Sequence, residues 1–142
     1  MKRHPALVSY SSDHHHGLVW ARKLADITET TPPDTKADVA SEFLDVWGAE
    51  IAPHFTTEEE ILLPLYAIHG EINHPSIRQM LAQHIALRRD ILLIRETPTT
   101  TLLRQIGEQL RAHIRHEEQE VFPLIEDKTP EEILQKIKRL SD

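Results

Sequence analysis

Two segments of the chain share a pattern of residues that can bind a metal ion. His54-Phe-Thr-Thr-Glu58 and His113-Ile-Arg-His-Glu117 each place a histidine four residues before a glutamate. A separation of four turns an α-helix only about 40° past one full turn, so both polar groups share one helical face. Each pair interrupts an apolar stripe. The stripes read Phe43, Trp47, Ile51, His54, Glu58, Ile61 or Leu62, Leu65, and Leu103, Ile106, Leu110, His113, Glu117, Val121, Leu124.

An apolar stripe is expected to face the protein core, so both pairs should be buried. A buried carboxylate without a partner costs several kcal/mol, and a buried imidazole adds to that cost. Because the pattern occurs twice, we expect a bound cation that both pairs reach.

Single histidines on two further stripes complete the candidate ligands. His84 lies on an apolar face that also carries Leu87. In the first stretch His14, His15 and His16 compete, since neighbouring positions on a helix differ by about 100°. We take His15 as the ligand because it shares a stripe with Leu18 and Val19, and His14 stays the alternative.

The predicted ligand set is therefore His15, His54, Glu58, His84, His113 and Glu117. Four imidazoles and two carboxylates are too many for one tetrahedral zinc ion and suit two ions bridged by the carboxylates. Glu59 and Glu118 lie five residues after the histidines, about 140° away from them, and are expected to be solvated or to support the ligands from outside. The other histidines that we assign to the surface or to loops are His4, His69, His74 and His116.

Four long amphipathic helices and a short tail helix are needed to position these residues. They are expected over about Ala6 to Ile27, from a cap at Asp34 to Ile68 or His69, from a cap at Asn73 or Ser76 over Ile77 to Arg95, from Thr97-Pro98 to Ile125, and from a capping box at Thr129 to Leu140. Pro53 and Pro64 should bend the second helix. No useful alternating β pattern occurs, and loops of a few residues favour an all-α, antiparallel up-down four-helix bundle.

Composition narrows the class of protein. A length of 142 residues fits a single domain, residues 1–142, with a proper core. The net charge of −7 argues against nucleic acids and anionic membrane surfaces as partners. The absence of cysteine excludes disulfides, iron–sulfur clusters and thiolate zinc sites. Without an apolar leader or a membrane-length apolar run, we expect a soluble, cytoplasmic protein.

Four segments together resemble the hemerythrin-like, or HHE cation-binding, domain. They are Asp-His14-His-His-Gly-Leu, His54-Phe-Thr-Thr-Glu-Glu, Gln-His84-Ile-Ala-Leu-Arg and His113-Ile-Arg-His-Glu-Glu, in order and at similar separations over about Tyr10 to Glu126. This resemblance implies an up-down four-helix bundle that holds a carboxylate-bridged di-iron centre.

The chain departs from the oxygen-carrying members of that family at two points. They carry His-x-x-x-His on the third helix, where this chain has Met80 four residues before His84. They carry His-x-x-x-x-Asp on the fourth, where this chain has Glu117 at four and Glu118 at five. One imidazole fewer leaves a coordination position for water, for Glu59 or for a small exogenous ligand, which argues against simple reversible oxygen carriage.

We therefore expect two iron ions and a small diatomic or peroxide ligand (oxygen, nitric oxide or peroxide), in sensing, storage or detoxification. An alternative is an iron-responsive or partner-binding module without turnover, for which the tail helix offers an apolar surface. A third alternative is a structural bundle that holds zinc or manganese, since nitrogen and oxygen ligands accept those ions as well.

Overall fold

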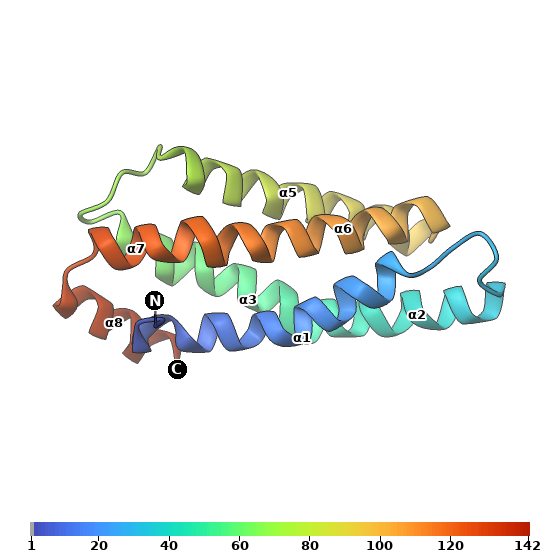
Figure 1. The fold of residues 1–142 in the computed structure, drawn as a ribbon, viewed down its shortest axis with the longest axis horizontal. Coiled ribbons are helices and arrows are strands. Elements are labelled where there is room, and N and C mark those ends of the chain that lie inside the picture. The colour runs from blue at the N-terminus through green and yellow to red at the C-terminus, as the bar shows by residue number, and fades with distance from the viewer. Residues whose placement is uncertain (1) are drawn as a thin grey trace.

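The computed structural model describes residues 2–142, and every regular element in that range is helical (Figure 1). The elements are η1 (Pro5–Leu7), α1 (Val8–Ala25), α2 (Pro33–Val46), η2 (Trp47–Ile51), α3 (Ala52–Thr57), η3 (Glu58–Leu62), α4 (Leu63–Tyr66), α5 (Pro75–Glu96), α6 (Thr100–His116), η4 (Glu117–Val121), α7 (Phe122–Lys128) and α8 (Glu131–Ser141). Elements α2 to α4 follow one another without a loop, as do α6 to α7, so each series forms one long helix.

The chain runs along the long axis four times and reverses at each loop (Figure 1). The four passes are α1, the α2–α4 helix, α5 and the α6–α7 helix, and α8 folds back near the N-terminal end (Figure 1). This course is compatible with the expected antiparallel four-helix bundle.

Helix α1 packs most extensively on α6, and a glycine makes this possible. A Cβ atom on Gly107 would lie 2.6 Å from the Ala21 carbonyl oxygen and 2.7 Å from the Ala25 amide nitrogen. These are backbone atoms that a side-chain rotation cannot move away. Only glycine therefore lets the two helices approach this closely.

Three wide π-turns accommodate the prolines inside the long helices. The amides of Ala52, Leu63 and Phe122, each directly before a proline, donate to the carbonyl five residues back. Proline lacks an N–H group and its ring crowds the carbonyl four residues back, and a wider turn relieves both problems. The expected effect of Pro53 and Pro64 on the second helix thus takes the form of η2 and η3, and Pro123 follows η4 in the same way.

Two of the π-turns, η3 and η4, also move the buried stripe by one residue. Beyond η3 the buried residue is Tyr66 at 1% exposure, and Leu65, the stripe position expected from regular helical spacing, is only partly buried. Beyond η4 the same shift buries Ile125 and leaves Leu124 partly buried. The extra residue in the wide turn explains both corrections.

Several predicted helix caps are wrong. The second helix starts at Pro33, which is well suited to the first helical position, so Asp34 lies inside the first turn. The third is capped by His74, whose side chain accepts a hydrogen bond from the Ser76 amide at 3.1 Å, and not by Asn73 or Ser76.

The last two helices also begin differently from the prediction. The fourth starts at Thr100, where the Thr99 hydroxyl accepts from the Leu102 amide at 3.2 Å. The tail helix has Pro130 at its N-cap with no side-chain cap, so the capping box at Thr129 does not form.

The apolar core consists of two clusters. One contains residues such as Trp20, Phe43 and Leu103, and the other contains residues such as Tyr10, Leu62 and Phe122. Helix α8 adds Leu134 and Ile137 to the second cluster, so the tail helix covers that end of the bundle with the apolar face that we considered for a partner. No helix in residues 2–142 has the length and apolar character required to cross a membrane.

Candidate metal site

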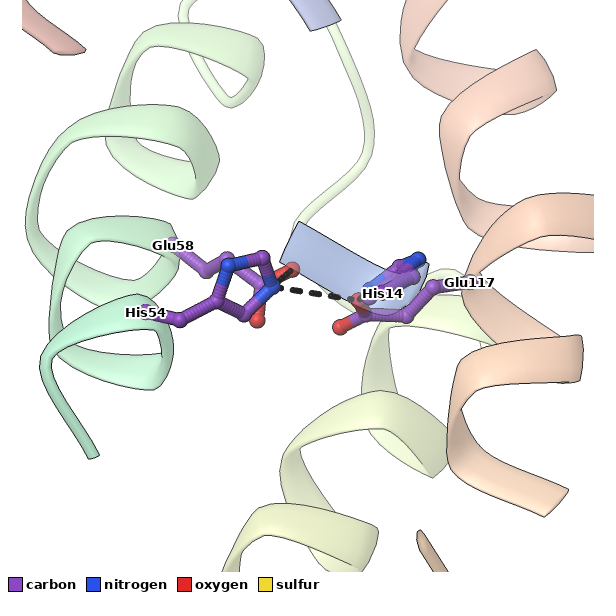
Figure 2. A group of neighbouring side chains, drawn as sticks. All are labelled: His14, His54, Glu58 and Glu117. Atoms are coloured by element: carbon purple, nitrogen blue, oxygen red, sulfur yellow. Dashed lines mark hydrogen bonds and ion pairs between the residues drawn. The ribbon is translucent and has the colours of Figure 1, made fainter. Parts of the chain in front are cut away.

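Six buried polar side chains meet in the layer between the two apolar clusters. They are His14 from α1, His54 from α3, Glu58 at the start of η3, His84 from α5, His113 from α6 and Glu117 at the start of η4. All are at most 8% exposed, and both glutamates are at 0%. Figure 2 shows His54 and Glu58 on one helix facing Glu117 on another, with His14 beside Glu117.

The six side chains form two groups that share both glutamates. One group is His14, His54, Glu58 and Glu117, and the other is Glu58, His84, His113 and Glu117. Within each group one candidate ligand atom per residue lies within 4.8 Å of all the others. This is the arrangement that two cations bridged by two carboxylates require.

The inward nitrogen of every histidine lies near a shared glutamate. Glu117 is 2.8 Å from the Nε2 atom of His14, 3.0 Å from that of His113, 3.6 Å from that of His84 and 3.8 Å from that of His54. Glu58 is 3.3 Å from the Nε2 atom of His54 and 3.2 Å from that of His84. Glu117 therefore lies within ion-pair distance of all four imidazoles.

The outer nitrogen of every histidine has a hydrogen-bond acceptor. The Nδ1 pairs are His14 with Glu118 at 3.0 Å, His54 with Asp13 at 3.0 Å, His84 with Glu59 at 2.6 Å and His113 with Gln83 at 2.7 Å. Since the partner is an oxygen acceptor each time, Nδ1 carries the proton and donates. In the neutral form of each imidazole this leaves the Nε2 lone pair pointing inward, which is the tautomer that a metal-binding histidine needs.

Most of the inward atoms lack hydrogen bonds of their own; the exception is the Nε2 atom of His14, which pairs with Glu117 at 2.8 Å. Eight buried side-chain atoms in residues 2–142 have no hydrogen-bond partner, and six of them belong to His54, Glu58, His84, His113 and Glu117. Several lie within ion-pair distance of one another, but their geometry does not form a hydrogen bond. Unsatisfied buried polar groups of this density fit a bound cation, which would complete all of them at once.

The carboxylates hold protons on His14, His54 and His84 when no metal is bound. Burial alone lowers the pKa of His14, but hydrogen bonds with Glu117 and Glu118 outweigh it and raise the pKa to about 9. At His84 burial is likewise outweighed by Glu117 and Glu58, which raise the pKa to about 9.

Burial and the neighbouring charged groups also have opposite effects on the pKa values of His54 and Glu117. At His54 the effect of burial is outweighed by the charge of Glu58 and the hydrogen bond with Asp13, and the pKa rises to about 12. Burial raises the pKa of Glu117, but the surrounding histidines, His113 first, hold it well below its usual value. The site thus favours positive charge, as protons or as metal ions.

The structure brings together five of the six predicted ligands, and the placement of His15 is wrong. His15 is exposed, and the alternative, His14, occupies the site at 6% exposure. The stripe that favoured His15 was misread, because Leu18 and Val19 are 42% and 47% exposed. The buried face of α1 carries Tyr10, His14, Gly17 and Ala21, so the small residues that face α6 were the signal that sequence reasoning missed.

The neighbouring polar residues were predicted in part. Glu59 and Glu118 support His84 and His14 from outside, as expected. Asp13 and Gln83 were missed, although each directly precedes a histidine of the site. His116 was wrongly assigned to the surface: it is 9% exposed and its Nε2 hydrogen-bonds the Ser76 carbonyl at 2.8 Å.

A cavity of about 510 Å³ lies beside the site. Its walls come from α1, the α2–α3 stretch and α6, and it reaches His14, His54 and His113. Apolar lining from Ile51 and Leu110 adjoins more polar residues such as Ser12. A small molecule can therefore approach the histidines without unfolding the bundle.

Comparison with known proteins gives one positive finding. The family model described as the hemerythrin HHE cation-binding domain matches residues 7–135. Neither the curated proteins nor the solved structures contain a significant match to the chain. The matched range includes all six side chains of the site.

Proposed function

Because the chain belongs to the hemerythrin HHE cation-binding family, we propose that it is a non-haem di-iron protein that binds a small ligand. The ligands we propose are His14 and His54 for one ion, His84 and His113 for the other, and Glu58 and Glu117 as bridges. We propose that a single domain, folded as an antiparallel up-down four-helix bundle, holds these ligands. We propose a cytoplasmic location, since a chain without cysteine needs no oxidising compartment in order to fold.

One observation carries this proposal. Two four-residue groups share Glu58 and Glu117, and most of their inward atoms lack any other partner. A lone carboxylate–histidine pair could be satisfied by one hydrogen bond, but this layer holds four imidazoles around two carboxylates. Two divalent cations match the donors in number, because each would gain two nitrogen and two oxygen ligands.

Aromatic side chains hold two of the imidazoles in place. The Phe55 ring stacks on His84 with centroids 3.9 Å apart and planes at 6°, and Phe122 stacks on His14 at 5.5 Å and 1°. Fixed rings and fixed Nδ1 hydrogen bonds leave Nε2 little freedom, so the site is organised before any ion arrives.

Iron held there would supply one-electron chemistry and a place for oxygen, nitric oxide or peroxide to bind. The chain itself provides few ligands per ion, and Met80, one helical turn before His84, is fully buried in the apolar cluster. Each position therefore keeps room for an exogenous ligand, and the cavity beside His14 and His54 gives it a route. We propose that the outcome is sensing, storage or detoxification of that ligand.

The experiment that tests this proposal is metal analysis combined with absorption spectroscopy. Protein purified anaerobically should take up two iron ions per chain, and its visible spectrum should change on exposure to oxygen, nitric oxide or peroxide. Zinc and manganese, added in competition, identify the preferred metal. Uptake of one ion, or of none, would contradict the proposal.

A surface on α5 favours a second candidate function, an iron-responsive module that binds a partner without turnover. Leu81, Ile85 and Leu92 recur at helical spacing and are 37%, 68% and 67% exposed. Arg88 lies beside this stripe and donates to Glu59 at 2.6 Å, and Glu59 accepts from His84, so the surface is linked to a proposed ligand. Metal-dependent capture of a partner with no consumption of peroxide or nitric oxide would favour this function.

A further inference from the structure

The two proposed metal positions differ in the groups that support their histidines. We call His14 and His54 the first pair, and His84 and His113 the second pair. In both, the inward Nε2 atoms face the shared glutamates. The outer Nδ1 atoms, however, meet partners of different charge, and this difference distinguishes the two positions.

Both histidines of the first pair donate to a carboxylate. His54 donates to Asp13 at 3.0 Å, and no cation is recorded within ion-pair distance of Asp13 in residues 2–142. His14 donates to Glu118 at 3.0 Å, and Glu118 also accepts from the Ser11 hydroxyl at 2.8 Å. The nearest cation to Glu118 is Arg3, at 3.6 Å. Most of the negative charge behind the first pair is thus available to it.

The second pair has weaker support. His84 donates to Glu59 at 2.6 Å, but the same oxygen of Glu59 accepts from Arg88 at 2.6 Å. His113 donates to Gln83 at 2.7 Å, and an amide carries no charge. At the second pair, the formal charges of Glu59, Gln83 and Arg88 sum to zero. At the first pair, the formal charges of Asp13, Glu118 and Arg3 sum to a negative value.

Such partners change how strongly an imidazole binds a metal. A carboxylate that accepts the Nδ1 proton raises the basicity of Nε2, and loss of such a partner typically lowers metal affinity about 10- to 100-fold. The net negative charge adds an electrostatic attraction for a divalent cation. We propose that the position of His14 and His54 binds its ion first and more tightly, and that the position of His84 and His113 fills second. This inference rests on the proposed dinuclear site.

The test is a titration of the metal-free, full-length protein with Co²⁺, in which calorimetry and visible absorption monitor the binding. Two steps are expected. Repulsion between two dications separates the steps in any dinuclear site, so the assignment depends on which step each substitution changes.

Asp13→Asn should weaken the first step about 10- to 100-fold, because it removes the carboxylate behind His54. Gln83→Glu should strengthen the second step by a similar factor and bring the two steps together. The matched control is Glu60→Gln, an exposed glutamate beside Glu59 in η3, which should leave both steps unchanged.

The reverse result would overturn the ordering. If Asp13→Asn weakened only the second step, or if Gln83→Glu strengthened the first, the second pair would be the tighter position. No change in either step would show that these partners do not tune the site. The Asp13 side chain is 63% exposed, so its substitution should fold even if Gln83→Glu does not. Uptake of a single ion in total would contradict the dinuclear site itself, and the ordering with it.

Discussion

Glu117→Gln should remove both metal ions, although it changes only one side chain and keeps its shape. Glu117 is completely buried and lies within ion-pair distance of the Nε2 atoms of all four histidines, from 2.8 Å at His14 to 3.8 Å at His54. An amide has one oxygen in place of two and carries no charge, so it cannot bridge two cations. A substitution at one histidine, by contrast, should weaken one position more than the other.

The same substitution should lower stability. Removal of one partner from a buried, charged cluster lowers the free energy of unfolding by about 3–5 kcal/mol. The reason is that the Glu117 carboxylate would no longer balance the positive charge of the buried histidines. For a domain of this size the loss corresponds to a fall in melting temperature of roughly 6–20 °C. Loss of bound metal destabilises the protein further, by about 2.7 kcal/mol for each site at a free metal concentration of 100 times its Kd.

The assay is iron content per chain together with thermal unfolding, with and without iron. The matched control is Glu120→Gln, in the same π-turn but exposed, which should keep both ions and the original melting temperature. A Glu117→Gln protein that retained two ions and melted like the unsubstituted chain would refute the assignment of Glu117 as a bridge.

The remaining predictions concern single histidines, pH and oxygen. His14→Ala should lower the iron content and His15→Ala should not, since only the former is buried at the site; equal losses in metal analysis would contradict this. His116→Ala should keep both ions yet lower the free energy of unfolding by about 0.5–1.5 kcal/mol, because the hydrogen bond between His116 and the Ser76 carbonyl is lost; urea unfolding and iron content measure the two effects. The metal-free protein should lose stability as pH rises from 6.5 through about 9, because the pKa values of His14 and His84 are raised in the folded state. Urea unfolding measured across that pH range checks this, and a stability that rose with pH would contradict the reasoning. The reduced iron protein, once exposed to oxygen and purged, should not recover its original visible spectrum, because Met80 replaces the extra imidazole of the oxygen carriers; full recovery would restore oxygen carriage.

The sequence was most informative where spacing alone determines geometry. His54 with Glu58, and His113 with Glu117, lie on one face because four residues nearly complete a helical turn, and the glutamate of each pair is the first residue of a π-turn. His84 followed from the same periodicity. These five residues meet in the structure as expected.

The errors come from features that depend on tertiary packing. The choice of His15 over His14 depended on which residues of α1 face α6, and the small residues Gly17 and Ala21 decide this, not the exposed Leu18 and Val19. Beyond η3 and η4 the stripe moves by one residue, which regular helical spacing cannot anticipate.

The residues that form hydrogen bonds with the histidines were the hardest to predict from the sequence. Asp13 and Gln83 are ordinary polar residues in the sequence, and their role appears only when His54 and His113 from other helices reach them. His116 was similar, because its partner, the Ser76 carbonyl, belongs to the start of α5.

The most direct test of the proposed function is a crystal structure of the iron-loaded protein with anomalous diffraction at the iron absorption edge. Our account predicts two iron peaks between Glu58 and Glu117, one near the Nε2 atoms of His14 and His54 and the other near those of His84 and His113. A single peak, or peaks away from the two glutamates, would contradict it.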